Sequence, residues 1–211
     1  NTVIIDSQEW VQENLTVSKY NDGTIIPQVT DPTAWANLTT GAWCYYNNDA
    51  ANGLIYGKLY NYYAVEGIHD NDPNTPNKFL APTGWHIPTD VEWTTLTTFV
   101  GGPTVSNIGV ISSVGGQFKS TGTLLWLNPN ISATNSTGFT GLPGGMRGPN
   151  GFSFYNINLH GFWWSSTAIN SYEVWNRGLS YDNNDVWRTY WFCIKPDGYS
   201  VRLLNDTLFS D

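Results

Sequence analysis

The chain has 211 residues, enough for one domain with a buried core, and its 21 glycines, 15% aromatic and 12% charged residues favour short strands and tight turns over a helical bundle. Its formal net charge of -8 argues against binding to a nucleic-acid backbone, which requires clustered Lys and Arg. No apolar run approaches the length of a membrane-spanning helix, so membrane insertion is not expected either.

The first predicted element lies at residues 2 to 15, where "TVIIDSQEWVQENL" indicates a strand and a turn. Strand signals return in "GKLYNYYAV" at 57 to 65, in "GFWWSST" at 161 to 167 and in the closing "GYSVRLL" at 198 to 204. A Pro- and Asn-rich stretch at 66 to 79 predicts a loop, and a Gly-rich stretch covers 137 to 154. This order predicts a single α+β domain over residues 1 to 211, with short strands and many irregular connections.

The best-defined helix is predicted in "HIPTDVEWTTLTTFVGG", residues 86 to 102. Thr89 and Glu92 have the spacing of a capping box, in which each side chain satisfies a backbone N–H at the start of the helix. Gly101 and Gly102 supply a stop signal at the other end. The helical spacing of Trp93, Leu96 and Val100 predicts that one side of this helix packs on a core.

The histidines and cysteines give no recognisable catalytic set. His86 immediately precedes the helix cap, and we expect it to be a hydrogen-bonded structural residue rather than a base. Cys44 and Cys193 are too few for a zinc site, and either one disulfide or two unpaired thiols would fit. No metalloprotease motif and no phosphate-binding loop is present.

One Asp- and Asn-rich loop raises the question of calcium. "HDNDPN" at 69 to 74 places several side-chain oxygens close together but lacks the spacing and the final Glu of an EF-hand. We therefore expect a solvated turn with Asx hydrogen bonds, and the same holds for "YNNDAAN" at 46 to 52.

Six motifs in this order resemble the Fibrobacter succinogenes major paralogous domain family. They are "DGTIIPQVTDPTAWANLTTGAWCYYNND", "GKLYNYYAV", "LAPTGWHIPTDVEWTTLT", "ATNSTGFTGLPGGMR", "GFWWSST" and "GYSVRLL". The resemblance covers about residues 3 to 206. It implies a C-type lectin-like fold with paired terminal strands, two helices and a long irregular segment, related to formylglycine-generating enzymes and to variable proteins diversified by retroelements.

The activities of these relatives are not expected here. The enzymes use a pair of cysteines in the C-terminal part of the domain, whereas this chain has Cys193 alone and carries Leu203 at the possible partner position. Sugar-binding relatives supply calcium ligands from a Trp-Asn-Asp strand, but "VWNR" at 174 to 177 places Arg177 where Asp is required. We therefore predict no enzyme and no cofactor; a calcium site of another kind stays open.

The stretch "EVWNRGLSYDNNDVWRTYWF", residues 173 to 192, predicts a hairpin with its tip at 182 to 185. A four-residue loop pairs Tyr181 with Val186, and alternation then sorts the side chains onto two faces. The first face is predicted to be scaffold, and its arginines are expected to pair with carboxylates or backbone carbonyls or to stack on rings. It comprises Trp175, Arg177, Leu179, Tyr181, Val186, Arg188, Tyr190 and Phe192.

The second face combines tryptophan with small polar side chains, a mixture typical of protein-binding surfaces. It comprises Asn176, Gly178, Ser180, Trp187, Thr189 and Trp191. The resemblance implies that variable residues of the retroelement-diversified relatives lie in this C-terminal segment. From these arguments we predict a ligand-binding set of Asn176, Ser180, Tyr181, Asn183, Asn184, Asp185, Trp187, Thr189, Tyr190 and Trp191.

The resulting hypothesis is a non-enzymatic recognition domain that binds a protein or glycan on a cell or host surface through its C-terminal face. Composition and resemblance suggest a domain that is secreted, displayed on a bacterial surface or carried on a phage tail. The main alternative is a structural or accessory module of a secreted surface protein without a dedicated ligand.

Overall fold

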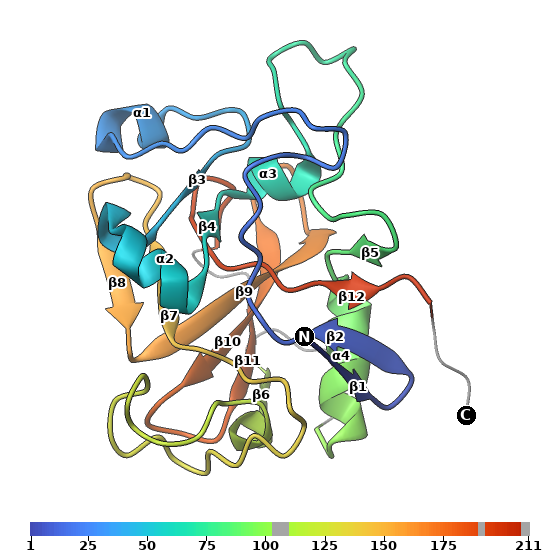
Figure 1. Ribbon diagram of the computed structural model, residues 1–211, viewed down its shortest axis with the longest axis vertical. Coiled ribbons are helices and arrows are strands. Elements are labelled where there is room, and N and C mark those ends of the chain that lie inside the picture. The colour runs from blue at the N-terminus through green and yellow to red at the C-terminus, as the bar shows by residue number, and fades with distance from the viewer. Residues whose placement is uncertain (103–109, 190–192, 208–211) are drawn as a thin grey trace.

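The computed structural model describes residues 1–102, 110–189 and 193–207, and Figure 1 shows their arrangement. Helices and sheets are mixed along the chain, as predicted for an α+β domain. Two helices were expected, but the described residues form four α-helices, of which three have seven residues or fewer. They are α1 (Pro32–Ala36), α2 (Ala50–Tyr56), α3 (Tyr62–Glu66) and α4 (Asp90–Phe99).

The three short helices each begin at an Asx residue. The side chains of Asp31, Asp49 and Asn61 cap α1, α2 and α3 by accepting a backbone N–H of the first turn. These helices are too short to show a helical repeat of apolar residues, which explains why the sequence pattern did not reveal them.

The first and last strands lie in one four-stranded sheet, but the last strand pairs with the second strand of the chain rather than with the first. Leu204 pairs with Trp10 on one side and with His86 on the other. The order of this sheet is β1 (Thr2–Ile5), β2 (Gln8–Val11), β12 (Leu204–Asn205) and β5 (Trp85–His86).

A six-stranded sheet forms the centre of the molecule, and its longest strand is β9 (His160–Ala168). The order is β6 (Val110–Ser112), β11 (Val186–Thr189), β10 (Val174–Ser180), β9, β7 (Gly144–Arg147) and β8 (Phe154–Ile157). A separate pair joins β3 (Trp43–Cys44) to β4 (Leu59–Tyr60).

Helix α4 has the predicted capping box. The Thr89 side chain accepts the backbone N–H of Glu92, and the Glu92 carboxylate accepts the backbone N–H of Thr89. Trp93 and Leu96 are buried, as their spacing predicted. In the part of the chain that the structure describes, no helix has the length and apolar character needed to cross a membrane.

The segment between β6 and β7 is almost entirely irregular and contains the short 3-10 helix η2 (Gly115–Gln117). A second 3-10 helix, η1 (Tyr46–Asn48), precedes α2. The irregular segment is nevertheless fixed, because Phe118, Trp126 and Phe139 are buried in the same cluster as Trp163 of β9. It forms the lower loops in Figure 1.

Residues 199–204 run through the middle of the fold rather than along its surface. Tyr199 bridges to Tyr60, and Ser200 bridges to Trp163. Further along, the Leu203 carbonyl accepts the backbone N–H of Val11. The last described part of the chain therefore joins β4, β9 and the N-terminal strands.

Candidate functional site

The first face of the β10–β11 hairpin is scaffold, as predicted. Arg177 is 2% exposed, and it donates to the Asp90 carboxylate at 2.7 Å. Arg188 reaches the same carboxylate, with Nε 2.9 Å from Oδ1 and Nη2 2.5 Å from Oδ2. Leu179 and Val186 are buried beside them. Both arginines thus pair with one carboxylate at the start of α4, which confirms the predicted ion pairing.

Electrostatics support this contact. Burial alone would raise the pKa of Asp90, but the guanidinium groups of Arg188 and Arg177 outweigh it and hold the pKa below its ordinary value. The Arg188 guanidinium also lies 3.5 Å from the centroid of the Trp175 ring, which confirms the expected aromatic stacking.

The predicted register of the hairpin was wrong by two residues. Val186 pairs with Leu179 rather than with Tyr181, and Trp187 pairs with Gly178. The loop therefore spans residues 180–185 instead of 182–185. Because side chains alternate with a period of two, a shift of two residues leaves every described side chain on its predicted face.

Two residues of the predicted ligand-binding set are not on the surface. Asn176 is 2% exposed and Ser180 is fully buried, so neither can contact a ligand directly. Burial raises the pKa values of Cys193 and Tyr199, and the Asn176 side chain beside them opposes this rise. Its Oδ1 has no hydrogen-bond partner among the described residues. The Ser180 hydroxyl donates to Asp182 at 2.6 Å. Both side chains therefore face the interior of the domain.

Trp187 of β11 forms a half-buried aromatic patch with two residues of β9, which lies on the other side of β10. Its ring centroid lies 5.0 Å from that of His160 and 6.5 Å from that of Phe162. A Cβ atom at Gly178 would lie 3.0 Å from the Trp187 ring and 3.3 Å from the Phe162 ring, so a larger residue there would push on both rings. We call His160, Phe162 and Trp187 the aromatic patch.

The aromatic patch is continuous with the core. Phe162 stacks on Tyr199 at 5.4 Å, and Tyr199 contacts Trp164 at 4.4 Å. Burial lowers the pKa of His160, and Nδ1 of its ring has no hydrogen-bond partner among the described residues. The sequence prediction missed His160 and Phe162, although period-two alternation along 160–168 could have placed both on the face opposite Trp163.

The tip of the hairpin is fixed by the buried Lys119. Its ammonium group donates to three backbone carbonyls, those of Ile131 at 2.7 Å, Ser180 at 2.8 Å and Asn183 at 2.9 Å. Asn184 accepts the backbone N–H of Gly116 at 2.6 Å. The tip is thus attached to the irregular segment that precedes β7.

The other predicted binding residues occupy different environments. Asn184 contributes both ends of its amide to structural bonds, and Asp185 accepts the Ser113 hydroxyl at 3.3 Å. Tyr190 and Trp191 lie outside the described residues. Half-exposed side chains remain at Tyr181, Asn183, Asn184, Asp185, Trp187 and Thr189.

His86 has the structural role predicted for it. Its ring nitrogens lie 2.7 Å from Asp206 and 2.9 Å from Glu92, and these contacts raise its pKa despite partial burial. Cys44 and Cys193 are both buried free thiols, so the disulfide alternative is not realised. Within the described ranges, no three His, Cys, Asp or Glu side chains are grouped so that they could hold a metal ion.

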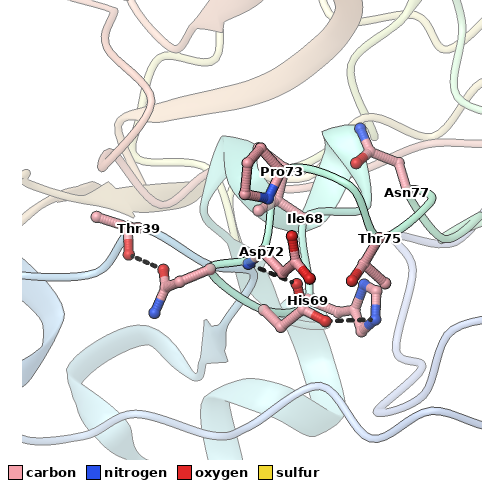
Figure 2. A pocket seen from close by; sticks show the side chains of 9 residues that line it. Thr39, Ile68, His69, Asp72, Pro73, Thr75 and Asn77 are labelled. Carbon is pink, nitrogen blue, oxygen red and sulfur yellow. Dashed lines mark hydrogen bonds and ion pairs between the residues drawn. The ribbon is translucent and has the colours of Figure 1, made fainter.

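A pocket of about 290 Å³ lies at the loop between α3 and β5 (Figure 2). Asp70 accepts the backbone N–H of Asp72 at 3.0 Å, and Asp72 accepts that of Asn74 at 2.9 Å. Thr39 donates to Asn71 across the pocket at 2.7 Å. The Asx turns predicted at 69 to 74 are therefore confirmed, and these oxygens already serve the local structure. The same prediction for 46 to 52 was wrong, because these residues form η1 and the beginning of α2 with Asp49 as its cap.

Comparison with known proteins agrees with the family suggested by the sequence motifs. A family model described as the Fibrobacter succinogenes major domain matches residues 3–205, nearly the whole chain. No curated protein and no solved structure matches it. The match therefore assigns the chain to a family, but it indicates no activity for the site.

Proposed function

The chain belongs to the Fibrobacter succinogenes major domain family, and we propose that it is a non-enzymatic recognition domain of C-type lectin-like fold. Its ligand is a protein or glycan bound through the C-terminal face. The paired strands β2 and β12 and the long irregular segment before β7 support the proposed fold. Fold alone carries no activity, so the function rests on the site.

The observation that carries the proposal is the aromatic patch. Trp187 on β11 and Phe162 and His160 on β9 are partly exposed together, one on each side of β10. Aromatic side chains give large contact area at low entropic cost and are enriched at the energetically important positions of interfaces. Beneath them, Asp90 joins the hairpin to α4, so the patch is presented on a rigid support.

The chemistry of the reactive groups also favours binding over catalysis. Burial raises the pKa values of both thiols, which leaves them protonated and poorly nucleophilic. His86 is held between two carboxylates. Polar side chains at the hairpin tip and at the end of β11, among them Asn183 and Thr189, supply adaptable hydrogen bonds for the ligand.

We place the ligand on a cell or host surface, with the domain secreted, surface-displayed or carried on a phage tail; the low charge content supports this. We further propose that the segment is subject to retroelement diversification. A nearby reverse-transcriptase gene with a near-copy of the codons for residues 170 to 195 would support that part.

The binding proposal is tested by screening the purified domain on glycan and surface-protein arrays and measuring the affinity for any ligand found. Trp187→Ala should weaken binding at least tenfold while circular dichroism and the melting transition stay close to those of the parent. Tyr172→Ala, which removes an aromatic ring that is 57% exposed outside the patch, is the matched control and should bind normally.

Three results would contradict the proposal. Unchanged affinity of Trp187→Ala for an identified ligand would remove the patch from the site, and global unfolding of this variant would assign Trp187 to the core. Silence of the parent protein across both arrays would favour a structural or accessory module without a dedicated ligand.

A further inference from the structure

A groove of about 430 Å³ lies between the end of α3, residues 77–81 and strand β5, within the size range of small-molecule sites. Figure 1 shows the chain leaving α3, arching outward and returning to β5. The groove touches β9 at Ser166, whereas the aromatic patch lies at His160 and Phe162 near the start of that strand. It is therefore a separate site.

The groove is preformed by the backbone. Gly67 ends α3 with a φ of 78°, and its carbonyl accepts the backbone N–H of Lys78 at 2.9 Å. A side chain at Gly67 would come within 1.8 Å of the Lys78 carbonyl oxygen, so only glycine permits this approach. The two walls are thus held together before any ligand binds.

Most of the lining is apolar. Leu80, Ala81 and Ile87 are buried and form part of it, together with the half-buried Trp85. The ring of Phe79 also lines the groove and is 72% exposed. A ligand that entered here would remove aromatic and aliphatic surface from water.

One acceptor in the lining lacks a partner. Glu66 receives the Lys195 ammonium group on Oε1 at 2.6 Å, but its Oε2 is buried and has no hydrogen-bond partner among the described residues. A buried carboxylate oxygen without a donor is unfavourable, so a ligand whose donor meets Oε2 after a rotation of the Glu66 side chain toward the groove would gain a charge-assisted hydrogen bond.

The charges around the groove select the type of donor. Lys78 is paired with Asp22 at 2.7 Å, and His86 lies between Glu92 and Asp206. Together with the Glu66–Lys195 pair, the charged groups in these contacts are four carboxylates, two ammonium groups and one imidazole. The surroundings stay net negative even when the imidazole is protonated, which disfavours an anion and favours a cation.

We propose that this groove binds a small organic amine, in which a protonated amino group is attached to an apolar body. The amino group donates to Glu66, and the apolar body contacts Trp85 and Phe79. Aromatic rings beside a cation add a favourable electrostatic contact. The site is independent of the proposed ligand face on the hairpin.

Three matched probes test the proposal with the full chain in NMR titrations. Phenethylamine, 2-phenylethanol and phenylacetate share the aromatic ring and differ in the charge of the attached group. We expect phenethylamine to shift the amide signals of residues 65–89 and to bind at least fivefold more tightly than the alcohol, with no saturable shift from phenylacetate. Nα-acetyl-lysine amide, tested alongside, distinguishes a peptide lysine from a free amine.

Two variants locate the site. Glu66→Gln should reduce phenethylamine affinity at least fivefold, and Phe79→Ala should reduce it about threefold. Phe79 is exposed, so its removal leaves the fold intact. Phe152→Ala and Glu173→Gln, which change an exposed ring and a carboxylate elsewhere, are the controls. Equal binding of all three probes, no binding of phenethylamine, or full affinity in Glu66→Gln would overturn the proposal.

Discussion

Arg177 and Asp90 form a buried ion pair, with Nη1 of the guanidinium 2.7 Å from Oδ1 of the carboxylate. Asp90 is the first residue of α4, and Arg177 lies within β10. Because Arg188 of β11 reaches the same carboxylate, one side chain joins the helix to both strands of the hairpin. The support of the proposed ligand face therefore depends on a single acidic residue.

Asp90→Asn should destabilise the domain by about 3–5 kcal/mol, because it leaves the buried Arg177 without a counter-charge. Urea unfolding at pH 7 measures the loss, and Asp6→Asn at an exposed position is the control. The lowered pKa of Asp90 gives a second signature. The contribution of the Asp90 carboxylate to the free energy of unfolding is complete above the unfolded-state pKa of about 4. It is lost as the pH falls through the lower folded-state pKa. A loss below about 1 kcal/mol would contradict this account.

Lys119→Met should loosen the hairpin tip, because three backbone carbonyls lose their shared donor. We expect a loss of about 2–3 kcal/mol and faster hydrogen exchange at Asn183 to Asp185. Lys19→Met changes an exposed lysine and serves as the control. Unchanged exchange at the tip would mean that Asn184 and its contacts hold the tip without Lys119.

Asp197→Asn should stabilise the domain at high pH. Burial raises the pKa of Asp197 to about 7 from an ordinary value of 3.8, and its Oδ1 has no partner among the described residues. The folded state therefore holds a proton that the unfolded state releases. As the pH rises from about 4 to about 7, the contribution of Asp197 to the free energy of unfolding falls.

The size of this effect follows from the shift in pKa, which corresponds to at most about 4 kcal/mol. Chemical unfolding of parent and variant at pH 5 and pH 8 measures it, and the difference between them should grow toward pH 8. Equal differences at the two pH values would show that the Asp197 carboxyl titrates normally.

Cys44 and Cys193 should resist a thiol reagent in the native state, because both are fully buried and burial raises their pKa values. Two thiols should react at once after unfolding in guanidinium chloride. Mass spectrometry without a reductant should give the fully reduced mass. A mass lower by two hydrogens, or immediate native-state labelling, would contradict the structure.

Local signals in the sequence predicted the local parts of the fold. The capping box at Thr89 and the apolar spacing of Trp93 and Leu96 defined α4, because both depend on residues within a few positions of one another. The division of the hairpin into two faces also survived the wrong register, since a two-residue shift preserves alternation.

Long-range partners explain what the sequence could not predict. Asn176 is polar but buried, because Cys193 and, in the segment that runs through the core, Tyr199 lie against it. The loop at the tip is longer than predicted, and Lys119, more than 60 positions away, holds it. Such contacts leave no trace in the spacing of neighbouring residues.

The central path of residues 199–204 has a consequence for synthesis in the cell. Trp10, Tyr60 and Trp163 each find a backbone partner in this segment, which leaves the ribosome after all of them. Until then, several large aromatic side chains of the nascent domain stay exposed to solvent. Exposed apolar surface of this kind binds chaperones or other unfolded chains. Its productive folding is expected to begin only after the codon for Leu204 has been translated and the segment has cleared the exit tunnel.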